Sequence, residues 1–268
     1  MISASVFFIV STSFSESNNN TVGSTNFAFA SYLGTGFYST SGQDVFVIQL
    51  PFDYIITQKT NTEAGLIVNL PLTIGIINFS NINSDELPDI KDITTLTFLP
   101  GLEYQYPITP NWTISPFVDY GFARDFNNAT NISVFGMGIK SFYNIPVGDA
   151  MVSLGNRFLY ARESNKNTNI NSDYSLIETG LNYRVTSDYS HEGGAIFSNL
   201  YYINFYYPKN LVFLEQTNKP IRVDSENEIG ITFSNLPDFW FFEKPQIGLG
   251  VRFSNDVNVY RLVFGAPF

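Results

Sequence analysis

The sequence predicts an all-β protein: a transmembrane, up-and-down antiparallel β-barrel of about 12 strands, with about 14 as the alternative count. Three observations support this. Apolar and polar residues alternate over segments of about ten residues, the length of a tilted strand that crosses a membrane. Aromatic residues are frequent, with 16 Tyr and 26 Phe, and they gather at the ends of these segments, as interfacial girdles require. Charged residues make up only 14%, whereas globular proteins average about 25%.

The alternation is clear in the segment 112–125, where Val118, Tyr120 and Phe122 share one face and Asp119 and Gly121 the other. A soluble sandwich also alternates, so the length of the apolar faces and their aromatic ends decide between the two. The longest apolar runs fall far short of the roughly 20 residues of a membrane-spanning helix. With a mean hydropathy of only +0.01, the chain is not a helical membrane protein.

The expected strands follow from counting back along the alternation from the carboxy terminus. They lie near 257–268, 245–254, 225–235, 195–207, 173–185, 149–162, 131–143, 112–125, 94–106, 63–77, 44–57 and 26–38. Periplasmic turns are expected at Pro107–Asn111, Asn144–Gly148 and Thr186–Gly194, and polar outer loops at Asn78–Asp92, Asn127–Thr130 and Glu163–Ser172. Residues 26–268 form the barrel in this interpretation.

Residues 1–25 stay open as a leader remnant, a tail or an extra strand, because a strand at 3–14 would spoil the even count. A misjudged boundary between 201 and 223 would give the larger count. The formal charge of −10 argues against a nucleic-acid partner, since no basic stripe could meet the phosphate backbone. The absence of Cys fits an envelope protein without disulfides, although many cytosolic proteins lack Cys as well.

The last strand looks like the signal by which bacterial outer-membrane barrels are recognised by their insertion machinery. Tyr260, Leu262, Phe264 and Phe268 share one face, and Arg261 lies on the other. We therefore expect the assembly machinery, outer-membrane lipid and lipopolysaccharide among the partners, and the bacterial outer membrane as the location.

The chain also resembles the solitary outer-membrane autotransporter-like β-barrel family, over roughly residues 45–268. The resemblance rests on Leu70-Pro71-Leu72-Thr73, Leu87-Pro88-Asp89, Leu99-Pro100-Gly101-Leu102-Glu103, Trp112, Pro116, Tyr120-Gly121, Asp125, Gly248 to Phe253 and Phe264 to Phe268. It implies a barrel like an autotransporter translocator without a passenger domain. These are strand patterns and not chemical signatures, and the family has no established catalytic residues to carry over.

Seven charged residues are expected to face the barrel interior. They are Glu103, Asp119, Arg157, Glu178, Arg184, Arg252 and Arg261. Arg or Lys facing lipid near the middle of the membrane would cost roughly 2–4 kcal/mol each, so these charges belong on the polar face. Two roles stay open: opposed charges could select small solutes, or Arg–carboxylate pairs could brace a narrow barrel.

The leading hypothesis is a non-enzymatic barrel, acting as a narrow pore or a structural surface protein, without cofactor or metal. The alternative is a partner-binding barrel, an adhesin or the membrane subunit of an envelope complex; Phe239, Trp240, Phe241 and Phe242 are the candidate contact, or else a membrane anchor. A lipid-modifying enzyme is the third hypothesis. It would need His191, the one histidine, but Ser190, His191 and Glu192 are consecutive and point to opposite faces of an extended chain.

Overall fold

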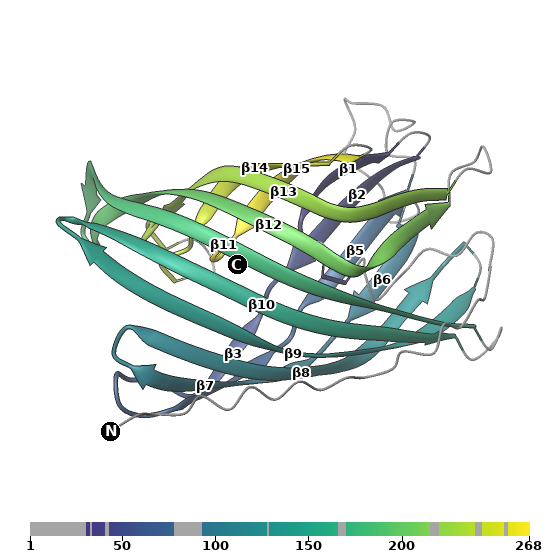
Figure 1. Ribbon diagram of the computed structural model, residues 1–268, viewed down its shortest axis with the longest axis horizontal. Coiled ribbons are helices and arrows are strands. Elements are labelled where there is room, and N and C mark those ends of the chain that lie inside the picture. Colours follow the sequence, from purple (N-terminus) through teal and green to yellow (C-terminus); the bar gives the residue numbers. More distant parts are fainter. Residues whose placement is uncertain are drawn as a thin grey trace, which may run out of the picture.

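The computed structural model describes residues 31–32, 34–40, 43–77, 93–127, 129–165, 170–214, 220–238, 243–254 and 257–268. Within these ranges the chain is built from strands alone, and all of the strand pairs are antiparallel. No helix in the described part is long and apolar enough to cross a membrane. Figure 1 shows the strands wrapping into one tilted barrel.

The first strands along the chain are short. They are β1 (Gly36–Thr40), β2 (Gln43–Leu50), β3 (Asp53–Thr57), β4 (Gly65–Asn69), β5 (Leu72–Ile77), β6 (Thr95–Phe98) and β7 (Gly101–Thr109). The middle strands are long, and the last two are short again. They are β8 (Trp112–Asp125), β9 (Thr130–Val147), β10 (Ala150–Asn165), β11 (Ile170–His191), β12 (Gly194–Leu214), β13 (Pro220–Ser234), β14 (Ile247–Phe253) and β15 (Val257–Phe264).

The barrel closes between β1 and β15, where Gly36 lies opposite Arg261. Three wall strands are each interrupted once: β2 continues as β3, β4 as β5, and β6 as β7, because both halves pair with the same neighbouring wall strand. The segments described here therefore form twelve wall strands. The predicted all-β, antiparallel barrel of about 12 strands is confirmed.

Each interruption contains a proline. Pro51, Pro71 and Pro100 stand between the paired segments of adjacent wall strands, and we call this line the proline crease. Proline has no N–H to give to a sheet ladder, so regular pairing stops there. Neighbouring N–H groups bridge the gap: Leu99 N donates to the carbonyl oxygen of Pro71 at 3.2 Å and Tyr120 N to that of Pro100 at 2.9 Å. The strands are interrupted at the crease, but the wall stays hydrogen-bonded across it.

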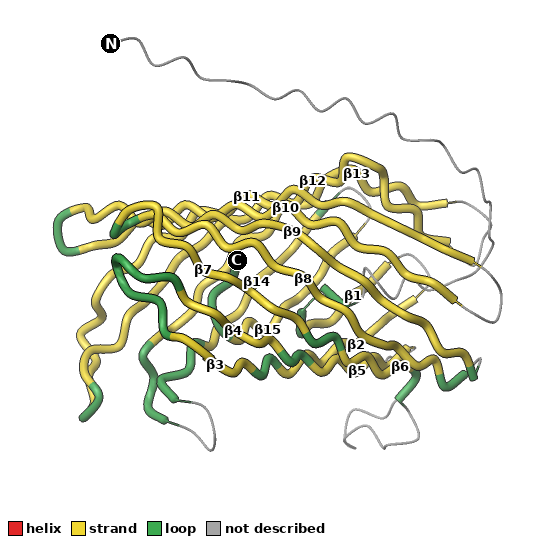
Figure 2. The backbone as a smooth tube through the Cα atoms, turned by 90° about the horizontal axis from the view of Figure 1, so that it is seen from below, coloured by secondary structure: helices red, strands yellow, loops and turns green. Residues whose placement is uncertain are grey.

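The two ends of the barrel differ. We call the end with the turns 110–111, 148–149 and 192–193 the turn end, and the opposite end, with the connection 126–129, the loop end. Along β8 the side chains of Val118, Tyr120 and Phe122 face outward and are exposed, while Asp119 on the inner face is buried. The predicted alternation thus places an apolar surface outside and a mixed polar surface inside. Figure 2 shows the tilted strands between the two ends.

Several predicted boundaries are corrected by the structure. The strand predicted at 26–38 begins only at Gly36, because Ser31, Tyr32 and Thr35 lie in the interior and not in the wall; residues 26–30 and 33 lie outside the described ranges. Gly34 has a φ of +78°, a backbone conformation that turns the chain at little cost only for glycine. The turn predicted at Thr186–Gly194 is mostly strand, since β11 continues to His191 across an irregularity after Thr186.

The loop predicted at Glu163–Ser172 also shrinks, since β10 and β11 pair up to Asn165 and Ile170. The predicted turn at Pro107–Asn111 is reduced to residues 110–111, because β7 continues to Thr109. The predicted loop Asn78–Asp92, the amino-terminal segment 1–25 and the aromatic run Phe239 to Phe242 fall outside the described ranges.

Candidate functional site

Six of the seven predicted inward charges belong to two clusters inside the barrel, and Arg184 lies apart from both. Glu103, Asp119, Glu178 and Arg252 are buried. The side chains of Arg157 and Arg261 are only 23% and 12% exposed, and each forms an ion pair with a carboxylate on another strand. One cluster lies at the barrel closure and the other across the interior on β7 to β11.

The cluster at the closure, which we call the seam cluster, is centred on Glu228 of β13. Its carboxylate accepts a hydrogen bond from Arg252 Nε at 2.9 Å and ion pairs with Arg261 Nη1 at 2.7 Å. Tyr201 donates its hydroxyl proton to the same carboxylate at 2.9 Å. Glu228 is fully buried, so these charge-assisted bonds compensate the loss of water around the carboxylate. Because Tyr201 lies on β12 and Arg261 on β15, the cluster joins the four strands β12 to β15 beside the closure.

The guanidinium of Arg252 contacts an aromatic ring as well as two carboxylates. Its guanidinium lies 3.8 Å from the ring centroid of Phe205 and 3.7 Å from a carboxylate oxygen of Glu226. Tyr207 donates a hydrogen bond of 2.7 Å to Glu226. Such geometry suits a planar cation, which stacks on an aromatic face while its edge bonds carboxylates.

The second cluster, which we call the wall cluster, is a set of cross-strand pairs. Arg157 and Glu178 are direct partners on β10 and β11, with 2.5 Å between Nη2 and Oε2. Lys140 Nζ lies 2.6 Å from Glu103 Oε2. Asp119 accepts a hydrogen bond of 2.7 Å from the hydroxyl of Tyr32. Each predicted inward carboxylate therefore has a partner in the described part of the chain.

Tyr32 and Thr35 connect β8 with β2 through the barrel interior. Thr35 both donates to and accepts from the backbone of Gln49 on β2, at 3.0 and 2.8 Å. Tyr32 reaches β8 on the other side of the interior, where it meets Asp119. Ser31 is 2% exposed, so it is also part of the packed interior and not of a surface strand.

Apolar side chains fill the space between the clusters. Val134, Leu159, Ala161 and Ile203 have no exposed surface although they stand on the inner face of the wall. The wider buried cluster includes Tyr38, Val47, Leu99, Phe117, Ala123, Ile132, Tyr174, Leu176, Val259 and Val263. Side chains that line a water-filled channel keep contact with water, so this level of the barrel is a packed core.

Sequence reasoning missed several interior groups. In the predicted strand 225–235, Glu226 and Glu228 lie on the face opposite Ile229 and Ile231. The rule that placed the other charges on the inner face therefore applies to these two glutamates as well. Lys140 is inward by the alternation of β9. Nothing in the sequence indicates that Tyr32 enters the barrel, because its position depends on where the chain leaves the wall.

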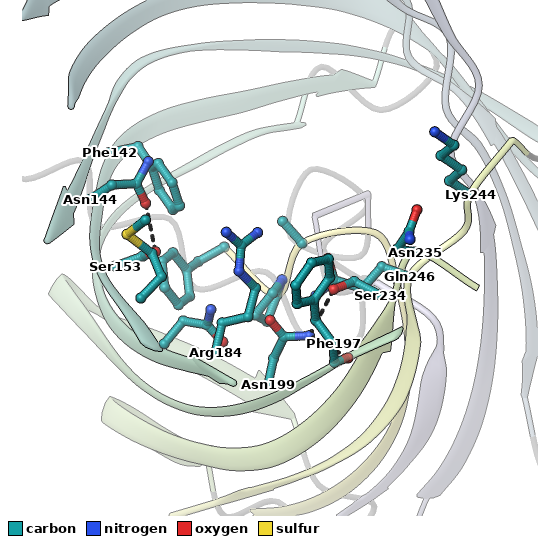
Figure 3. Close-up of a pocket in the computed structure, with 15 residues that line it drawn as sticks. Phe142, Asn144, Ser153, Arg184, Phe197, Asn199, Ser234, Asn235, Lys244 and Gln246 are labelled. Atoms are coloured by element: carbon teal, nitrogen blue, oxygen red, sulfur yellow. Dashed lines mark hydrogen bonds between the residues drawn. The ribbon is translucent and has the colours of Figure 1, made fainter. Parts of the chain in front are cut away.

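A pocket of about 410 Å³ opens at the turn end (Figure 3). The side chain of Arg184 points into it beside Phe197, with 4.9 Å from the guanidinium carbon to the ring centroid. Asn199 is fixed by its side-chain amide, which donates to Thr232 O at 3.2 Å and Ser234 Oγ at 3.1 Å. Unlike the other inward arginines, Arg184 has no carboxylate partner among the described residues.

The predicted face of the last strand is only partly correct. Tyr260 and Leu262 are exposed on the outer surface, but β15 ends at Phe264. Gly265, with a φ of +80°, redirects the chain, and Phe268 turns into the barrel, where its ring centroid lies 6.1 Å from that of Phe142. A two-residue alternation describes a face only while the strand continues.

His191 lies at the end of β11, near the turn to β12. Gly193 N donates to His191 Nδ1 at 3.0 Å, so Nε2 carries the proton and donates to the carbonyl oxygen of Asn235 at 2.8 Å. Both ring nitrogens are therefore engaged by backbone groups that hold the turn.

Comparison with protein-family models and with curated proteins gives no match to this chain.

Proposed function

We propose that this chain is a non-enzymatic bacterial outer-membrane barrel that acts as a structural surface protein, with an interior closed to ion flow. The apolar outer surface of a barrel that closes between β1 and β15 supports the membrane location, because this closure pairs the sheet edges except along β3, toward the turn end. Of the two roles that the sequence left open, pore or structural protein, the packed interior favours the structural one. The single observation that carries the proposal is the continuous buried layer formed by the apolar core and the two charge clusters.

Planar-bilayer recording of the purified barrel tests this proposal. Wild-type protein should stay silent in salts that separate cation from anion current, while a conducting porin recorded in parallel verifies the bilayer. Insertion of the silent barrel is checked by its heat-modifiable gel mobility. Reproducible, charge-selective current steps from the wild type would overturn the closed interior and restore the pore hypothesis.

A second candidate function, partner binding, is favoured by β3. All five of its residues are exposed, including Tyr54 at 66%, Ile55 at 51% and Ile56 at 52%. β3 pairs with β4 along one edge and, among the described residues, ends the sheet on its other edge. An unpaired apolar edge is a template for strand addition. Since β3 leads to the turn end, its partner would be a periplasmic extended segment.

Site-specific photocrosslinking in whole cells distinguishes this second function. A photoreactive residue at Ile55 should give one discrete adduct, whereas the same group at Thr62, in the exposed connection after β3, should give none. Adding Tyr54→Lys to the Ile55 probe should remove the adduct. Equal crosslinking at both positions would contradict a specific edge contact.

A further inference from the structure

The pocket at the turn end differs in charge from the rest of the interior. Arg184 and Lys244 are its cations, and no Asp or Glu side chain of the described residues lines it. Elsewhere in the interior, the arginines described above have carboxylate partners within 4 Å. A cation left without a counter-charge in a partly enclosed pocket attracts an anion from solution.

Hydrogen bonds hold part of the pocket lining in position. Asn199 is fixed by Thr232 and Ser234, and Gln246 donates to Thr232 Oγ1 at 2.7 Å. These bonds fix the amide positions around the guanidinium of Arg184. Figure 3 shows Arg184 aimed into the pocket from its floor, with Lys244 on the far rim.

Two further observations indicate an organic ligand. Phe142, Phe197 and Phe268 give the pocket flat apolar walls beside the cation. The side-chain oxygen of Asn182 is buried and has no hydrogen-bond partner among the described residues, so it can accept a bond only from an N–H or O–H group on the body of such a ligand, not from its anionic group. The volume of about 410 Å³ falls within the usual range of small-molecule sites, roughly 300–1,000 Å³.

We infer that the turn-end pocket binds a small organic oxyanion, with Arg184 as the residue that recognises its carboxylate or phosphate group. A guanidinium presents two parallel N–H donors that match such a group. The aromatic walls contact the apolar body of the ligand, and Lys244 adds attraction at the rim. This site is separate from the packed interior, so it does not depend on whether the barrel conducts.

Fluorine NMR of the folded barrel with 4-fluorobenzoate tests the inference. The wild type should broaden the probe signal saturably, inorganic phosphate should reverse the broadening, and the neutral analogue 4-fluorobenzamide should bind at least tenfold more weakly. Arg184→Gln should weaken binding of the anion about tenfold or more. The matched control Arg162→Gln, an exposed arginine of β10 outside the pocket, should leave it unchanged.

Equal binding of benzoate and benzamide, or unchanged benzoate binding in Arg184→Gln, would overturn the site. If Arg184→Gln does not fold, Lys244→Gln decides, because Lys244 lies at the rim in an exposed connection. This variant should weaken benzoate binding about two- to threefold and reduce its salt dependence. Benzoate binding by Lys244→Gln that matches the wild type at every salt concentration would then overturn the proposal.

Discussion

The barrel has two kinds of wall. From β2 to β7 the strand segments are four to nine residues long, and the proline crease interrupts them. From β9 to β13 the strands run for 15 to 22 residues, and their pairing continues past charged partners such as Arg157 and Glu178. In the creased wall the ladder is interrupted at the prolines. The long wall keeps its pairing apart from irregularities after Thr186 and Tyr206, and interior side chains connect its strands.

The difference teaches that closure of a narrow barrel draws on two sources of stability. In the creased wall, bridging bonds such as that from Tyr120 N to Pro100 O keep the sheet continuous. In the long wall, Glu178 and Glu228 belong to the wall and seam clusters, whose partners on this wall and on the neighbouring strands replace lost water around the buried charges. Substitutions in the long wall should therefore cost more than substitutions in the crease.

The largest effect is expected for Glu228→Gln. It removes the charge that compensates both Arg252 and Arg261, and loss of one partner of a buried pair costs about 3–5 kcal/mol. Guanidinium unfolding of the barrel in lipid vesicles, followed by Trp fluorescence, measures this. Glu192→Gln, at an exposed turn position, is the control and should leave the midpoint unchanged. Equal midpoints for the two variants would mean that the seam cluster does not brace the barrel.

A smaller effect is expected for Phe158→Arg on the outer face of β10. Phe158 is 46% exposed and central in its strand, so in the proposed membrane location an arginine there would face the lipid and cost about 2–4 kcal/mol. The same unfolding measurement applies, with Tyr189→Arg near the turn end as control, since Tyr189 is 76% exposed. An unfolding midpoint of Phe158→Arg equal to that of the wild type would argue against lipid contact at this wall.

Gly121→Val tests the edge of the crease. A Cβ at Gly121 would overlap the carbonyl oxygen of Phe98 on the adjacent β6, so the backbone must shift, at about 1–3 kcal/mol. Gly148→Asn is the control, because nothing lies near Gly148 and Asn tolerates its φ of +59°. Hydrogen exchange of the β6 and β8 amides should speed up only in Gly121→Val. Unchanged hydrogen exchange of these amides in Gly121→Val would show that the backbone at the crease accommodates the added side chain.

The smallest effect is expected for Pro71→Ala. The neighbouring backbone already bridges the crease at Pro71, so the loss comes mainly from greater freedom of the unfolded chain, at about 0.4–1 kcal/mol. The unfolding midpoint reports it, with Pro116→Ala in β8 for comparison. A loss as large as that of Glu228→Gln would erase the distinction between the two walls.

The sequence by itself determined the all-β barrel, the antiparallel order and about twelve strands, because a two-residue period needs only neighbouring residues to be read. It also placed Glu103 and Arg252 on the inner face. Tertiary structure alone decided which charges meet, since Arg261 reaches Glu228 across an intervening strand.

The same holds wherever the chain leaves the wall. The sequence pattern continued a strand through residues 31–35 and kept Phe268 on the outer face, but Tyr32 and Phe268 both turn inward beyond glycines with positive φ. Their places depend on free space in the interior, left by glycines on distant strands, such as Gly136 beside Tyr32 and Gly155 beside Phe268. Local alternation carries no information about that space, so only the closed barrel could decide it.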